Sequence, residues 1–270
     1  MEDKPVLSFV LFSIACIATL FFPYTWDIVK GTYWLLTYFF ILCFLGAVTL
    51  LFIKRGISLF PSLLFFDILF ALYPFILWQR KLVAYAFPGI LYAAPVLIYL
   101  GIVLAVRGYR KHRTWIRLGR FDGITALLIA VVSLVSAAGL LGWVTLADPD
   151  LDLFLAWMPD YPAMFLILGG MAFALSNAFV EELIFRAVIW EALWGFMSRS
   201  LIAIAVQALL FGLWHWRGFP GGPSGMALVF TWGMFLGWIR RRSGGMLAPF
   251  ICHVCADLTI FGILYSLAQR

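Results

Sequence analysis

Charged residues are scarce in this 270-residue chain: Asp, Glu, Lys and Arg together make up 12% of it, against about 25% in an ordinary soluble domain. Apolar residues reach 64%, where soluble domains hold about 45–50%. There is also no long polar stretch that would make a separate soluble domain. A soluble fold has nowhere to bury so much apolar surface. The composition therefore predicts a polytopic, all-α integral membrane protein.

Cysteine and histidine are also few, with four and three copies. All the cysteines fall in apolar runs, where we expect buried free thiols that behave as small hydrophobic side chains; they are Cys16, Cys43, Cys252 and Cys255. One histidine, His112, belongs to a basic segment and is expected at the surface. The other two, His215 and His253, interrupt apolar runs and are candidates for function.

Long apolar runs dominate the chain. A membrane helix needs about 20 mostly apolar residues, and by that measure we predict eight or nine transmembrane helices. The expected spans are 6–22, 33–53, 57–78, 82–106, 124–146, 162–180, 201–216, 226–239 and 246–267. The first is interpreted as a retained span, because no small-residue cleavage site follows it.

The basic segments predict the orientation in the membrane. Lys54-Arg55, Arg107–Arg120 and Arg240–Arg242 fall on one side if the spans alternate, and the positive-inside rule makes that side the cytoplasm. Arg80 and Lys81 would then lie outside, which is a poor fit. We predict an inner (plasma) membrane protein of bacterial type. The net charge of +6 is interpreted as a topology signal, not as a sign of nucleic-acid binding.

The segment "EELIFR" carries three charges into an apolar run. Each charged residue at membrane depth costs about 2.5–3.5 kcal/mol, so a function is expected. In an α-helix Arg186 lies about 40° from Glu182 but about 140° from Glu181. Glu182 is therefore predicted to pair with Arg186, whereas Glu181 has no local partner and suits a general base. A purely structural ion cluster is the alternative.

Two further segments, "FGLWH" and "HVCAD", bring in the histidines. If the helices before and after Ser198 form an antiparallel hairpin turning there, Glu181 and His215 lie at matching depth. His253 and Asp257 are four residues apart and share a helix face. The alternative interpretations are a hydrogen-bonded packing role for His215 and a self-satisfied pair for His253 and Asp257.

The ordered set "EELIFR", "FGLWH" and "HVCAD" resembles the CPBP family, the CAAX-prenyl-protease and bacteriocin-processing (Abi) proteins, over roughly residues 162–260. The resemblance implies a glutamic-type intramembrane endopeptidase. On this basis Glu181 activates water as general base, His215 holds that water, and Glu182 with Arg186 forms a supporting ion pair.

The same resemblance implies that His253, with the residue at position 257, stabilises the oxyanion. The prenyl-protease branch of the family has Asn at that position, and this chain has Asp257. An ionised carboxylate would repel an oxyanion, so we expect Asp257 to orient His253 unless burial keeps it protonated. The aspartate also argues against a prenylated CAAX substrate.

The chain is therefore predicted to be one transmembrane domain over 1–270, with accessory helices over 1–160 and catalytic helices over 161–267. The predicted partners are the lipid bilayer and a membrane-anchored peptide or protein, such as a sorting tail, a leader peptide or a lipidated C-terminus. No cofactor is expected; a divalent metal such as Zn is the alternative.

Other classes stay open from the sequence. A proton-coupled transporter would use mid-membrane ionisable groups such as Asp67. A non-catalytic scaffold or immunity protein would keep the fold without the chemistry. A haem protein could use His215 and His253 as axial ligands.

Overall fold

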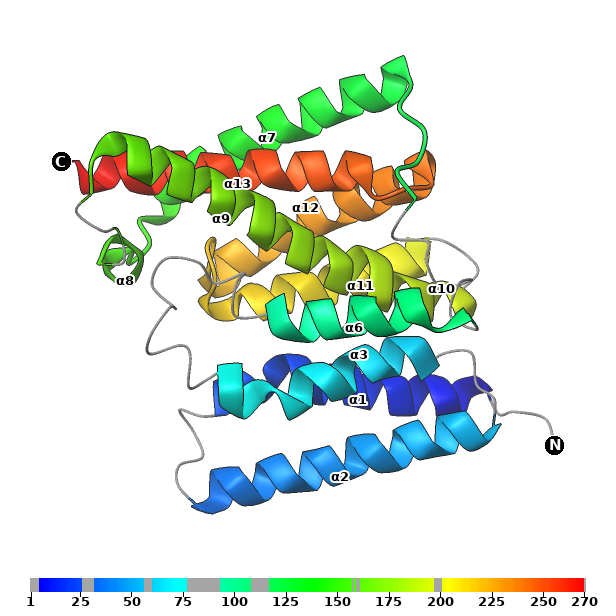
Figure 1. Ribbon diagram of the computed structural model, residues 1–270. Coiled ribbons are helices and arrows are strands. Elements are labelled where there is room, and N and C mark those ends of the chain that lie inside the picture. The colour runs from blue at the N-terminus through cyan, green and yellow to red at the C-terminus, as the bar shows by residue number, and fades with distance from the viewer. Residues whose placement is uncertain are drawn as a thin grey trace.

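The computed structural model describes residues 5–25, 32–55, 60–76, 93–107, 117–156, 158, 161–196 and 201–269. All regular secondary structure among these residues is helical (Figure 1), which confirms the all-α prediction for them. The elements are α1 (Pro5–Thr25), α2 (Thr32–Arg55), α3 (Phe60–Ala71), α6 (Ala93–Ala105), α7 (Gly123–Ala147), α8 (Asp152–Leu155), α9 (Ala163–Glu182), η3 (Leu183–Ile189), α10 (Trp190–Phe196), α11 (Leu201–Trp214), η4 (His215–Arg217), α12 (Gly222–Ser243) and α13 (Leu247–Ala268).

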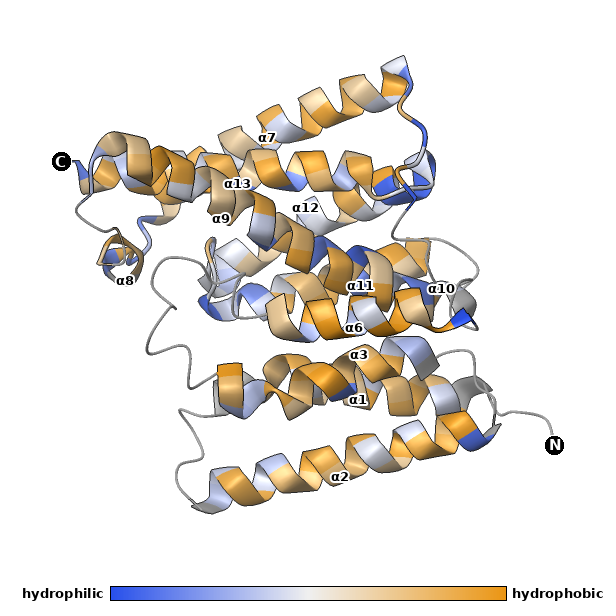
Figure 2. Ribbon diagram, in the orientation of Figure 1, coloured by the Kyte–Doolittle hydropathy of each residue, from blue (hydrophilic) through white to orange (hydrophobic). Residues whose placement is uncertain are grey.

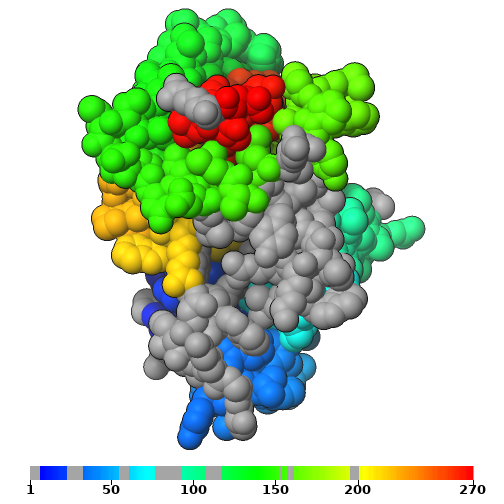
Figure 3. Space-filling view, turned by 90° about the vertical axis from the view of Figure 1, so that its left-hand side faces the viewer, coloured from blue at the N-terminus to red at the C-terminus, as the bar shows by residue number. Residues whose placement is uncertain are grey.

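The helices lie in layers, with α2 at one edge of the molecule and α7 at the other (Figure 1). The main contacts join α11 to α12, α13 to both α9 and α7, and α3 to α1, α2 and α6. The side view in Figure 3 has the same order, with α7 and α13 at the top and α2 at the bottom. Although α7 precedes residue 161, it packs with the helices that follow that residue.

Part of the predicted set of spans has the length and composition of a membrane helix. Four helical segments are long and apolar enough to cross a membrane: Tyr33–Lys54, Gly123–Ala147, Ala163–Trp194 and Leu247–Ala268. The other apolar helices among the described residues are shorter, as in α3 and α11. Residues 82–92 of the predicted fourth span lie outside the described residues. The sixth span was predicted to end at 180, but the helix continues to Phe196, because paired charges do not interrupt backbone hydrogen bonding.

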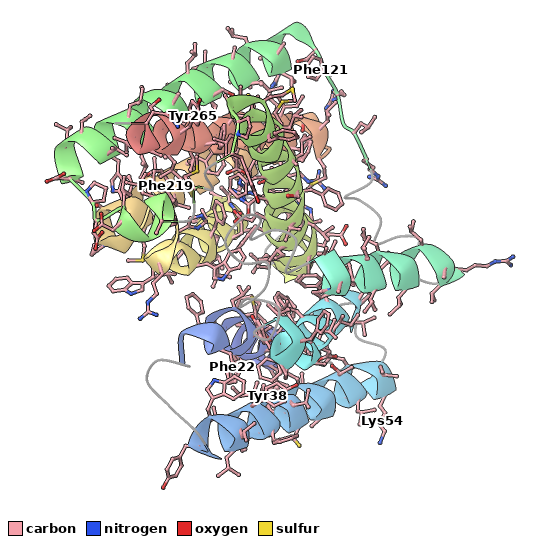
Figure 4. All side chains as sticks on the ribbon, turned by 60° about the vertical axis from the view of Figure 1, so that its left-hand side comes forward. Phe22, Tyr38, Lys54, Phe121, Phe219 and Tyr265 are labelled. Carbon is pink, nitrogen blue, oxygen red and sulfur yellow. The ribbon has the colours of Figure 1, made fainter. Side chains whose placement is uncertain are left out.

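Aromatic side chains join the N-terminal helices. The Phe22 ring lies 5.9 Å from the Tyr38 ring and 4.9 Å from the Phe70 ring, and Figure 4 shows Phe22 and Tyr38 together between α1 and α2. The Tyr73 hydroxyl donates to the Thr19 carbonyl at 2.6 Å. This group of helices contacts the rest of the chain partly through α3 against η3.

Asp67, the residue that a transporter would use, ties two of these helices. Its Oδ2 accepts a hydrogen bond from the Thr49 hydroxyl on α2 at 2.5 Å. The carboxylate is thus one half of a contact between α2 and α3.

Small residues bring α11 and α12 close together. A Cβ added at Gly212 would lie 2.8 Å from the Met226 carbonyl oxygen, and one at Gly233 would lie 3.2 Å from the Ala208 Cα. In lipid, helix association depends on such close van der Waals packing. This approach places α12 directly against α11, the helix that His215 follows.

The described residues of the basic segments gather at one end of the helices. Figure 2 shows hydrophilic residues at the right-hand ends of α2 and α6 and at the turn between α12 and α13. The segment before α7 is hydrogen-bonded to that turn: the Arg120 N–H donates to the Ser243 carbonyl and the Met246 N–H donates to the Arg117 carbonyl, both at 2.8 Å. The described basic residues therefore lie at the same end of the helices, which agrees with the predicted alternation of the spans.

The start of α7 is fixed at the same end by an N-cap. The backbone N–H and the hydroxyl of Thr125 both donate to Asp122 Oδ1, at 2.7 and 2.8 Å. These hydrogen bonds to the charged form hold the pKa of the exposed Asp122 carboxyl below its usual range. Arg242 Nη2 lies 3.5 Å from Asp122 Oδ2, so the cap also contacts the end of α12.

We expect Gly245→Ala to destabilise the protein. A Cβ there would overlap the backbone nitrogen of Gly119, so the turn and the segment before α7 must separate. Overpacking of this kind typically costs about 1–3 kcal/mol. The matched control is Gly262→Ala on α13, where an added Cβ meets nothing within 4 Å. Thermal unfolding in detergent should show a lower midpoint for Gly245→Ala alone; equal midpoints would contradict this packing.

Candidate active site

The two glutamates lie where the helix changes its winding. α9 ends at Glu182 and continues as the π-helix η3, which contains Arg186. π-helical turns are rare and frequently mark functional sites. Arg240 from α12 donates its Nε–H to the Arg186 carbonyl at 3.3 Å. The change of winding is thus supported by a side chain from a neighbouring helix.

Glu182 is the centre of the buried part of the site. Its Oε1 lies 3.0 Å from Arg186 Nη1 and 2.7 Å from His253 Nδ1. The predicted pair with Arg186 is therefore present, although the guanidinium lacks hydrogen-bond geometry with any described residue. The Arg186 Cζ also lies 4.3 Å from the centroid of the Phe211 ring, where a cation is attracted to the ring face.

Glu181 faces the two histidine rings. Its Oε2 lies 3.5 Å from His253 Nε2 and 4.0 Å from His215 Nε2. This oxygen is buried and has no hydrogen-bond partner among the described residues. Sequence spacing predicted matching depth for Glu181 and His215, and the two side chains do meet; the turn near Ser198 lies outside the described residues.

The His215 ring is oriented by the backbone of α11, the helix that immediately precedes it. Its Nδ1 lies 2.9 Å from the Phe211 carbonyl oxygen, which only accepts hydrogen bonds, so Nδ1 carries the proton. In the neutral ring Nε2 is then an acceptor. It faces Glu181 Oε2, another acceptor, across 4.0 Å. A water molecule that donates to both atoms satisfies this arrangement.

His253 is oriented by Glu182 rather than by Asp257. Its Nδ1–H donates to Glu182 at 2.7 Å, whereas Asp257 Oδ1 lies 3.8 Å from Nε2, beyond hydrogen-bond distance. Asp257 Oδ2 instead accepts a hydrogen bond from the Asn177 amide on α9 at 3.2 Å. The i,i+4 spacing places His253 and Asp257 on one face as predicted, but the orienting bond comes from another helix.

Three contributors to this site were missed from the sequence. Asn177 lies one turn before Glu181, so helical spacing could have found it. The Trp232 ring lies edge-to-face with the His253 ring, with the centroids 4.8 Å apart. Nothing in the apolar sequence around Trp232 distinguishes it from an ordinary packing residue. Arg240 was interpreted with its neighbours as a solvated topology signal, but its side chain is buried.

Carboxylate and imidazole groups such as those around Glu181 are also of the types that ligate divalent metal ions. Within the described residues, no group of three or more His, Cys, Asp and Glu side chains is arranged to hold one. Cys252 and Cys255, which flank His253, are free thiols. The absence of a cofactor from the reaction stays a prediction.

A comparison with protein families gives one match. Residues 162–259 match the family described as type II CAAX prenyl endopeptidase Rce1-like. This part of the chain is similar to the Rce1-like family. No curated protein and no solved structure matches the chain. The Rce1-like segment runs from the start of α9 into α13 and so contains all the side chains that meet around Glu181. The family resemblance predicted from the three motifs is confirmed.

Proposed function

We propose that this protein is an intramembrane endopeptidase that hydrolyses a peptide bond in a membrane-anchored substrate, with Glu181 as general base. One observation carries the proposal: the Glu181 carboxylate lies within 4.0 Å of the Nε2 atoms of both His215 and His253. These residues come from three helices. A purely structural cluster has no need to aim two imidazoles at an unbonded carboxylate oxygen. The Rce1-like match of residues 162–259 supports the same class of enzyme.

The geometry supports a reaction in which water is the nucleophile. Water held between Glu181 Oε2 and His215 Nε2 transfers a proton to Glu181 as its oxygen attacks the substrate carbonyl carbon. The tetrahedral intermediate that forms bears one negative oxygen. Collapse breaks the C–N bond, and the proton on Glu181 passes to the leaving nitrogen. The products are a carboxylic acid and an amine, so atoms and charge balance.

Glu182 and Arg186 have a supporting role in this proposal. Glu182 fixes the tautomer and direction of His253 through Nδ1, and Arg186 balances its charge in a buried place. The His253 Nε2 atom then points towards Glu181. Glu182 is thus a positioning residue for His253 in the proposed site.

The substrate is proposed to be anchored in the same bilayer, with the basic end of the helices in the cytoplasm. Sorting tails, leader peptides and lipidated C-termini are the candidate classes. A metal-assisted version of the reaction would keep the same substrate but require an ion at the site, which metal analysis of the purified active protein detects.

The experiment is a cleavage assay in liposomes with three fluorogenic reporters. These are a transmembrane peptide with a sorting-type tail, a peptide with a leader sequence, and a farnesylated C-terminal peptide. We expect the wild-type protein to cleave at least one of them. Folded wild-type protein that cleaves none of the reporters would favour a scaffold or transporter and contradict the proposal.

A further inference from the structure

The proposed reaction places a negative charge on the former carbonyl oxygen, and that oxygen needs hydrogen-bond donors. Most polar groups around Glu181 do not supply one. Glu181, Glu182 and Asp257 are acceptors when ionised. The Nδ1–H of His215 is bound to the Phe211 carbonyl, and the Nδ1–H of His253 is bound to Glu182.

Asn177 brings a neutral donor to the same helix face as Glu181. The two residues are four apart in α9, so their Cβ atoms lie about 5–6 Å apart on one side of the helix. The Asn177 side chain is only partly buried, which leaves it open to a substrate. A side-chain amide carries two N–H donors, and only one is needed for the contact with Asp257.

Asp257 holds this amide in place. Its Oδ2 accepts from Asn177 Nδ2 at 3.2 Å across the α9–α13 contact. The Asp257 side chain is buried, so this bond has little competition from water. Oriented by one N–H bond, the amide keeps its second N–H in a defined direction, as preorganised donors require.

We propose that Asn177 donates a hydrogen bond to the oxyanion of the tetrahedral intermediate, and that Asp257 positions the Asn177 amide for it. The assignment rests on the endopeptidase proposed above. It gives Asp257 a role that needs neither a protonated carboxyl nor a hydrogen bond to His253. The pair acts across α9 and α13, with the donor on the helix that carries the general base.

The test compares isosteric changes at the two positions, with the reporter that the wild-type protein cleaves fastest in liposomes. Asn177→Ala removes the donor, and Asn177→Asp replaces the amide by a carboxylate of the same size. Each should lower kcat by about 10²–10³, the usual effect of losing one oxyanion donor, with little change in KM because the donor acts in the transition state. Ser176→Ala, at the neighbouring residue, is the matched control and should keep the wild-type kcat.

The Asp257→Asn variant distinguishes two possibilities. In one, the Asn177 amide donates to the oxyanion and Asp257 only positions it; in the other, the Asp257 carboxylate itself takes part in the reaction. The amide oxygen of this variant can still accept from Asn177, so its loss in kcat should be at least about tenfold smaller than that of Asn177→Asp. Thermal unfolding of each variant in detergent shows whether a loss of kcat reflects loss of fold. We expect Asn177→Ala to lose kcat far beyond any fall in its folded fraction.

Several results would overturn the assignment. One is a wild-type kcat for Asn177→Ala; another is a loss of kcat that only follows a loss of folded protein. A defect in Asp257→Asn as large as that in Asn177→Asp would assign the chemistry to Asp257 itself. In each of these cases the proposed endopeptidase function remains supported, because the wild-type protein cleaves the reporter. Failure of the wild-type protein to cleave any reporter overturns the endopeptidase, and this assignment with it.

Discussion

Glu181→Gln is expected to reduce peptide cleavage below detection while leaving the fold intact. The amide cannot take a proton from water, and loss of a general base costs about 10²–10⁴ in rate. The substitution keeps the size of the side chain. It also leaves the neighbouring pair of Glu182 and Arg186 untouched. Cleavage rates should be measured in liposomes, and unfolding midpoints in detergent, for the variant and the wild-type protein.

The control for this substitution lies in α10, which follows α9 and η3 without a break. Glu191→Gln changes another glutamate outside the group around Glu181 and should keep measurable cleavage. A Glu181→Gln protein that cleaves its reporter at the wild-type rate would remove the general base from the proposed reaction. Loss of cleavage together with loss of fold would reduce Glu181 to a structural residue.

Glu182→Gln is expected to have the largest effect on stability. Arg186 is fully buried, and Glu182 Oε1 is the carboxylate oxygen 3.0 Å from its guanidinium. Removing one member of a buried ion pair typically costs about 3–5 kcal/mol, because the other charge stays in a low-dielectric place. Glu181→Gln is the matched control, since Glu181 is the adjacent glutamate and its Oε2 has no hydrogen-bond partner among the described residues. Thermal unfolding should separate the two variants clearly.

A double substitution tests the reason for that loss. Glu182→Gln combined with Arg186→Met removes both charges and should recover much of the stability lost by Glu182→Gln alone. In both variants the side-chain amide oxygen that Glu182→Gln introduces can still accept the hydrogen bond from His253. Any stability that the double variant does not recover is therefore due to the lost packing of the Arg186 side chain. If the double variant is no more stable than the single one, the buried charge of Arg186 is not the cause.

Contacts within one helix were predictable from the sequence, because a period of 3.6 residues fixes them. The Glu182–Arg186 pair and the shared face of His253 and Asp257 are of this kind. The apolar runs likewise predicted the positions of α2, α7 and α13 closely. These features depend on neighbours a few residues apart, and the residues themselves specify them.

Contacts between helices were not predictable in the same way. Glu182 and His253 are 71 residues apart, and nothing in the spacing indicates that this glutamate, rather than Asp257, orients the ring. The π-helix at Leu183–Ile189 shifts every residue after Glu182 relative to an α-helix, and hydropathy does not register it. In the sequence Arg240 could not be distinguished from the two arginines that follow it. Its burial depends on which side of α12 faces η3, and the sequence does not show this.

The most direct test of the central claim is the mass of the products formed in H₂¹⁸O. A membrane-anchored reporter incubated with the wild-type protein in liposomes should yield a new carboxyl terminus that carries ¹⁸O, and Glu181→Gln protein should yield none. That result requires water as the source of the new carboxyl oxygen and Glu181 for the reaction that delivers it. An intact reporter with folded wild-type protein, or equal ¹⁸O product from the Glu181→Gln variant, would contradict it.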